Sequence, residues 1–179
     1  MENPPFRKNE QRAIRSTSAG VRLRRILVAL DFLESTVEVL RTAAALAREY
    51  KATVTLLHIV KPDGSHVRRK ITRERLIEEL SEAGELQIHK LVDVIWGEEI
   101  TTDIVVASGK PHLQIVNEAR ETNADMIIMA SHGAVGAWGF FRRGTAAKVV
   151  RYAPCPVLVV PARGRGLVMD APVGIRPDH

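Results

Sequence analysis

The chain has 179 residues, of which 45% are hydrophobic, and this suits one domain with a core of ordinary size. No apolar run reaches the roughly 20 residues that a membrane-spanning helix needs, and the first residues lack the apolar stretch of a secretory signal. A single cysteine, Cys155, excludes an internal disulfide. We therefore expect a cytoplasmic protein that does not enter a membrane, with Cys155 in the core and not in a catalytic centre.

The formal net charge of +5 arises at the start of the chain. Seven of the 26 basic residues and two of the 21 acidic residues fall within positions 1–25, which leaves 19 of each sign in the remainder. A basic face on the folded domain is therefore not expected, and neither is a nucleic-acid partner, although the basic arm itself could still touch an anionic surface. We predict a basic, disordered leader over 1–23, a folded domain over 24–161 and a flexible tail over 162–179.

Five short apolar runs have the length and hydrophobicity of strands that are covered on both faces. They span residues 25–30, 53–60, 101–107, 125–130 and 156–160. Stretches of helical periodicity separate them, and strands that alternate with helices form a parallel sheet with right-handed crossovers. The sequence therefore predicts an α/β fold of three layers, in which helices cover both faces of a five-stranded parallel sheet.

Four helices are predicted between these strands. Ser35 and Glu38 form the pattern of a capping box at the start of the first helix. The second is a long amphipathic helix from about 71 to 96, Pro111 suits the first position of the third, and Thr145 opens the fourth. The residues expected to face the sheet are Val39, Ala43, Leu46, Ala47 and Tyr50, then Ile77, Leu80, Gly84, Ile88, Leu91 and Ile95, then Ile115, Val116 and Ala119.

The strongest functional signal lies between the fourth predicted strand and the fourth predicted helix. Glycines in this segment, residues 131–145, free backbone N–H groups to point at an anion, and the helix start adds partial positive charge. In open parallel sheets, ligands bind beyond the carboxyl ends of the strands, where the winding direction reverses. We therefore predict a phosphate-binding loop here, close to Leu30 and Asp31 at the end of the first strand.

Six segments in this order resemble the universal stress protein family over residues 25–160. They are Ile26–Asp31 with Ser35, Leu56–Val60, Gly109–Pro111, Asp125–Gly133, Gly144–Val150 and Ala153–Val160. The resemblance implies the strand order 3-2-1-4-5. It also implies a homodimer that pairs the fifth strands of two subunits and buries Val157, Leu158, Val159 and Val160 at the interface.

Members of this family that bind ATP carry the motif G-x2-G-x9-G-[S/T], which this chain matches in part. Ala130 stands at the first glycine, Gly133 matches the second, and ten residues separate Gly133 from Gly144 and Thr145. One extra loop residue costs far less than the roughly 0.6 kcal/mol of doubling a loop. Ala130 would cost about 1–2 kcal/mol if its backbone were left-handed, and nothing if it were extended.

The resemblance further implies a set of residues that contact ATP, with any Mg²⁺ held through the phosphates. Asp31 would accept a hydrogen bond from the adenine amino group, and its alternative role is a carboxylate that ends a strand or caps a helix. The whole set is Ala29, Asp31, Ile59, Met129, Ala130, Ser131, His132, Gly133, Gly144, Thr145 and Ala146. Arg142 and Arg143 either pair with phosphates or are solvated loop charges. His58 is expected to be a buried strand residue.

Three functions remain open from the sequence. The first is a non-catalytic, dimeric, ATP-binding stress or regulatory protein with an unknown protein partner. The second is a dimerising interaction module whose nucleotide site is vestigial. The third is an enzyme that adenylates a substrate or cleaves ATP, but the segment Asp31–Ser35 lacks the signatures of such enzymes, and the histidines show no metal-ligand spacing. We therefore predict no catalytic residue and no metal site, His132 included.

Overall fold

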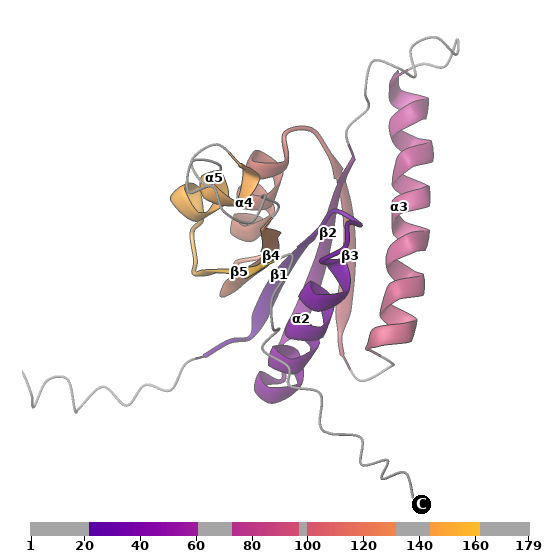
Figure 1. Cartoon of the computed structure of the whole chain (residues 1–179). Coiled ribbons are helices and arrows are strands. Elements are labelled where there is room, and N and C mark those ends of the chain that lie inside the picture. Colours follow the sequence, from indigo (N-terminus) through magenta and orange to yellow (C-terminus); the bar gives the residue numbers. More distant parts are fainter. Residues whose placement is uncertain (1–21, 61–72, 97–99, 132–143, 162–179) are drawn as a thin grey trace, which may run out of the picture.

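The computed structural model describes residues 22–60, 73–96, 100–131 and 144–161, which form a five-stranded parallel sheet between two layers of helices (Figure 1). The strands are β1 (Arg25–Leu30), β2 (Thr53–Val60), β3 (Thr102–Ser108), β4 (Met126–Ser131) and β5 (Val157–Pro161). The helices are α2 (Thr36–Tyr50), α3 (Arg73–Ile95), α4 (Pro111–Glu121) and α5 (Thr145–Tyr152). The predicted fold class is confirmed; the predicted leader and tail lie almost wholly outside the described residues.

The strands are arranged in the order β3-β2-β1-β4-β5, as the family resemblance implied. The chain winds outward from β1 through β2 to β3, then returns to pair β4 on the other side of β1. The winding direction therefore reverses between β1 and β4, which is where ligands bind in folds of this class.

Alternate side chains of each strand pack in two separate parts of the core. Ile26 and Val28 of β1 pack in the cluster beneath α2 and α3, whereas Leu27 packs in the cluster beneath α4 and α5. Successive side chains of a strand point to opposite faces, so a run of apolar residues is buried on both sides. This explains why β1 and β2 read as uninterrupted apolar runs in the sequence.

The predicted helical faces are largely confirmed. Ile115, Val116 and Ala119 are the buried residues of α4, which begins at Pro111 as expected. In α2, Val39, Ala43 and Ala47 are buried, but Tyr50 is 41% exposed, so the prediction for Tyr50 was wrong. Tyr50 is the last residue of the helix, and Lys51 follows it in a left-handed conformation with φ of 52°.

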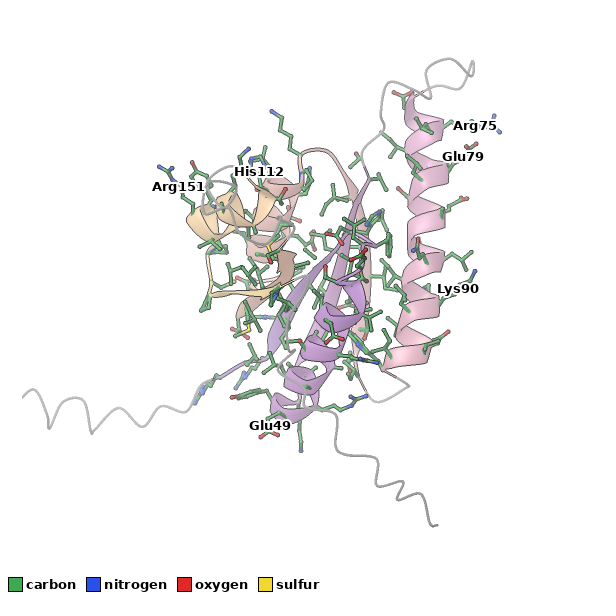
Figure 2. The ribbon with its side chains drawn as sticks, in the orientation of Figure 1. Glu49, Arg75, Glu79, Lys90, His112 and Arg151 are labelled. Carbon is green, nitrogen blue, oxygen red and sulfur yellow. The ribbon has the colours of Figure 1, made fainter. Side chains whose placement is uncertain are left out.

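Arg75, Glu79 and Lys90 lie on the face of α3 that points away from the sheet (Figure 2), and Leu86 and Val94 of the same helix are exposed as well. Arg75 and Glu79 lie one turn apart on this face, with 3.7 Å between the guanidinium Nε and a carboxylate oxygen. At the other end of the helix, Trp96 is buried and its indole N–H donates to the carbonyl oxygen of Leu40 in α2 at 3.0 Å. None of the described helices is both long and apolar enough to cross a membrane.

Asp125 joins β1 to β4 at the amino ends of both strands. Its carboxylate accepts hydrogen bonds from the backbone N–H groups of Arg24 at 2.8 Å and Arg25 at 2.9 Å. The guanidinium of Arg25 in turn donates to the carbonyl oxygen of Asn123 at 2.9 Å. The two backbone donors are the main reason that the pKa of Asp125 lies below its usual value of 3.8.

This carboxylate should make folding stability depend on pH. A depressed folded-state pKa contributes stability above the unfolded pKa near 3.8, and that contribution is lost as the pH falls through the folded value. Between pH 6 and pH 2, the wild-type protein should therefore lose more unfolding free energy than Asp125→Asn. Urea unfolding midpoints at the two pH values measure both losses, and equal losses would contradict the role of Asp125.

Candidate functional site

The carboxyl ends of β1 and β4 bring together residues about 100 positions apart in the chain. Ala29 in β1 is paired with Met129 in β4 and with Leu57 in β2. Asp31 follows the end of β1 directly, and Ser131 ends β4. The sequence predicted that the ends of these two strands meet, and they do so as direct neighbours in the sheet.

Four of the predicted contact residues share one face of the sheet. Met129 is a buried member of the cluster beneath α4 and α5, and Ala29, Ile59 and Ala146 pack against that cluster. They come from three neighbouring strands and the first turn of α5. Small and apolar side chains thus line this face next to Asp31, which is a surface that a flat aromatic ring can contact.

Ala130 lies within β4, so its backbone is extended. It is paired with Val160 and packs on the opposite face, in the cluster beneath α2 and α3. No left-handed conformation is required at this position, and alanine there carries no backbone strain. The backbone at Ala130 is extended, so the cost of about 1–2 kcal/mol expected for a left-handed alanine does not arise.

The turn after β1 holds Asp31 in a fixed geometry. Asp31 Oδ1 accepts a hydrogen bond from the backbone N–H of Leu33 at 3.1 Å, and the Leu33 carbonyl oxygen accepts one from the N–H of Thr36 at 2.9 Å. Between them, Phe32 has a φ of 58°, a left-handed conformation that costs a non-glycine residue about 1–2 kcal/mol. A bulky residue keeps such a conformation only where its surroundings stabilise it.

His58 supplies part of that stabilisation from β2. Its ring centroid lies 4.3 Å from that of Phe32, with the planes tilted by 42°, and its Nδ1 lies 3.0 Å from the carbonyl oxygen of Leu30. The expectation that His58 is a strand residue in the interior is correct only in part, because its side chain is half-buried and reaches across to β1. Periodicity alone gave no sign of this contact.

The start of α2 carries hydroxyl groups that are not used as the sequence predicted. Ser35 is the residue that precedes the helix, but its side chain makes no capping hydrogen bond, and Glu38 instead contacts Arg41 at 3.3 Å. Ser35 is only 1% exposed, and within the described part of the chain Ser35 Oγ and Thr36 Oγ1 are buried without a hydrogen-bond partner. The predicted capping box was therefore wrong, because the serine hydroxyl turns into the interior.

The start of α5 lies on the same edge of the sheet as Asp31. Gly144 precedes the helix, its carbonyl oxygen accepts from the N–H of Lys148 at 3.3 Å, and Thr145 and Ala146 are half-buried in the first turn. The first N–H groups of a helix lack intrahelical partners and carry partial positive charge. This edge can therefore hold an anion.

Positive side chains gather beside that edge, a feature that the sequence reading did not single out. Lys110 precedes α4 and His112 lies in its first turn, while Lys148 projects from α5 (Figure 2 labels His112). Burial and the ammonium groups of Lys148 and Lys110 hold the pKa of His112 below 6.5. The part of the shift that comes from the two lysines reflects a local positive potential, which is what a phosphate group would meet.

Several predicted contacts lie outside the described residues: His132, Gly133, Arg142 and Arg143. The central part of the phosphate-binding loop therefore stays a prediction. Among the residues that are described, no group of His, Cys, Asp and Glu side chains could hold a metal ion. Burial and the nearby Asp125 raise the pKa of Cys155, which disfavours the reactive thiolate and agrees with a place at the core.

Comparisons with known proteins agree with this arrangement. A sequence model of the Universal stress protein family matches residues 22–161. A universal stress protein of Methanocaldococcus jannaschii is 28% identical over 147 residues, covering 76% of this chain and 81% of its own length. The protein therefore belongs to the universal stress protein family.

Two solved structures share the fold. A universal stress protein from Archaeoglobus fulgidus, solved in complex with dAMP, is 25% identical with a TM-score of 0.53 and covers 77% of this chain and 98% of its own. A universal stress protein in complex with cAMP is 16% identical with a TM-score of 0.58, covering 79% and 98% of the two chains. At 16% identity, the second likeness concerns the fold alone.

The buried hydroxyl of Ser35 leads to a direct test. Replacing a serine that caps a helix by alanine costs about 1 kcal/mol, whereas removing a buried hydroxyl that lacks a partner costs nothing or stabilises. We expect Ser35→Ala to keep or raise the free energy of unfolding in urea, with Thr36→Val behaving likewise. A loss near 1 kcal/mol for Ser35→Ala would restore the capping interpretation.

Proposed function

We propose that the protein binds ATP, or another adenine nucleotide, beyond the carboxyl ends of β1 and β4 and acts as a regulatory stress protein without catalysing a reaction. The observation that carries the proposal is the shared face formed by Ala29, Ile59, Met129 and Ala146 beside Asp31. An adenine ring would lie against these side chains, and Asp31 would accept a hydrogen bond from its amino group. The phosphates would then extend toward the start of α5.

The local charge and the ligand of a related protein support adenine nucleotide binding as well. The start of α5 and the cations Lys110 and Lys148 offer positive potential on the edge where the phosphates would lie. The relative from Archaeoglobus fulgidus was solved with dAMP, which has the same base. If Mg²⁺ accompanies ATP, it would be held through the phosphates, since the described residues offer no cluster of metal ligands.

The vestigial site is the second candidate, and the ten-residue spacer between Gly133 and Gly144 favours it. The other reason for it, a strained Ala130, is removed by the extended backbone at that position. In this alternative the protein keeps the dimer and acts on a protein partner without a nucleotide. The single free thiol, Cys155, accords with the cytoplasmic location that we propose in either case.

Nucleotide binding is tested on the purified protein. Isothermal titration with ATP and Mg²⁺ should show binding, and mass spectrometry of the denatured protein should find any adenine nucleotide that was carried through purification. Asp31→Ala should weaken ATP binding about ten- to hundredfold, because a hydrogen bond to a charged group is lost. Inosine triphosphate, which has an oxygen in place of the amino group, should be affected much less. Wild-type protein that neither carries nor binds an adenine nucleotide would refute the proposal.

The proposed dimer uses the open edge of β5. This strand is at the end of the sheet, and Val157, Leu158 and Val159 are only half-buried in a single chain. The carbonyl oxygen of Pro156 accepts from Ile127 in β4, so by alternation Val157 and Val159 direct their backbone groups outward. Unpaired outward groups on an apolar edge strand favour pairing with a second copy.

Substitution at Val159 separates this edge from the rest of the fold. Val159→Pro removes one outward N–H without removing a β4–β5 hydrogen bond, and it should convert the dimer to a monomer. Val159→Thr keeps the N–H and nearly the same shape, and it should remain dimeric. Light scattering coupled to size-exclusion chromatography measures the mass of each. A wild-type monomer, or a Val159→Pro dimer as tight as the wild type, would contradict pairing through β5.

A further inference from the structure

We propose that His58 is a positioning residue of the nucleotide site. From the opposite face of the sheet it holds the Leu30–Asp31 peptide and the Phe32 ring. These contacts fix Asp31 in the orientation in which it accepts a hydrogen bond from the adenine amino group. The inference rests on the proposed nucleotide site. Leu57 and Ile59, the neighbours of His58 in β2, lie on the face that would contact the base, so His58 points to the opposite face and its role would be exerted through Asp31.

The contact with Leu30 fixes the peptide group that leads into Asp31. His58 is paired with Leu30 across the β1–β2 ladder, and its Nδ1 lies 3.0 Å from the Leu30 carbonyl oxygen, a usual hydrogen-bond distance. A carbonyl oxygen only accepts, so Nδ1 must carry the proton that is shared. Because a peptide unit is planar, an anchored carbonyl oxygen also fixes the N and Cα atoms of Asp31.

The contact with Phe32 fixes the residue on the other side of Asp31. The Phe32 ring lies against the His58 ring at a centroid distance of 4.3 Å, and it packs with the cluster beneath α2 and α3. This contact accompanies the left-handed backbone of Phe32, whose φ is 58°. Asp31 is therefore held between two residues that both touch one imidazole ring.

Helix α3 closes the third side of that ring. A Cβ atom added to Gly84 would lie 3.0 Å from His58 Cδ2, closer than ordinary van der Waals contact. Glycine is unfavourable inside a helix, and Gly84 lies within the 23 residues of α3, so its position is explained by the space that the imidazole needs. The end of β1, the turn after it and helix α3 thus all contact the His58 ring. None of these contacts involves the face where adenine would bind.

Two substitutions at position 58 separate the hydrogen bond from the bulk of the side chain. His58→Leu removes the donor and fills a similar volume, whereas His58→Asn places an amide N–H where Nδ1 lies. We expect His58→Leu to weaken ATP binding about three- to tenfold and inosine triphosphate binding less than twofold, because one neutral hydrogen bond is lost and only the amino-group contact depends on it. His58→Asn should recover most of the ATP affinity.

Gly84→Ala tests the same ring from α3 without touching Asp31 or His58. Alanine favours the helix, so this variant should not weaken α3 itself, yet its methyl group should displace the imidazole and lower ATP affinity selectively. His89→Leu removes an exposed imidazole from the same helix and should leave both affinities unchanged. In an Asp31→Ala background, His58→Leu should cause no further loss of ATP affinity, because residues that act as a unit are not additive.

Isothermal titration measures the affinity of each variant for ATP and for inosine triphosphate. Each titration is done at a temperature below the measured unfolding midpoint of that variant. A selective loss for ATP that Asn repairs supports the inference. Unchanged ATP affinity in both His58→Leu and Gly84→Ala, or equal losses for the two nucleotides, overturns it and leaves the proposed function intact. Wild-type protein that binds no adenine nucleotide overturns the proposed function and this inference together.

Discussion

The backbone ladder between β1 and β4 is the constraint on which the site depends. The two strands are parallel, so their carboxyl ends meet at one edge although Asp31 and Ser131 are a hundred positions apart. Asp125 ties the same two strands at their amino ends through the N–H groups of Arg24 and Arg25. A ladder anchored at one end and buried on both faces fixes strand separation at about 4.8 Å. The paired strands therefore fix the positions of the side chains at their carboxyl ends, which a loop alone could not do.

The two faces of the sheet contribute differently at this edge. On the face of α4 and α5, Ala29, Ile59 and Ala146 are small or apolar, and they pack against the buried cluster. On the face of α2 and α3, the chain accepts locally unfavourable features: a left-handed Phe32 and a glycine within a helix. Such strain persists only where the surrounding structure over-determines it, and it gathers near functional sites. Phe32 is the left-handed residue that lies next to Asp31, and its contacts hold the turn that carries this carboxylate.

Much of the architecture could be predicted from the sequence, because a strand that is buried on both faces is an uninterrupted run of apolar residues. β1 and β2 begin and end where their apolar runs do, and β3, β4 and β5 lie one residue further along the chain than expected. Periodicity cannot say which strands are neighbours, so the order came from the family resemblance and was then confirmed. Hydrophobic patterns also cannot show that Tyr50, the last residue of α2, is exposed.

The site was harder to predict than the fold, for a physical reason. Ser35 followed by Glu38 satisfies the local rule for a helix cap, but tertiary packing turns the serine inward. The left-handed Phe32 contradicts the local preference of a bulky residue, and its contacts with His58 and with the cluster beneath α2 and α3 account for it. Both departures fall within the turn that carries Asp31. Local rules fail there because distant elements, β2 and α3, decide the conformation.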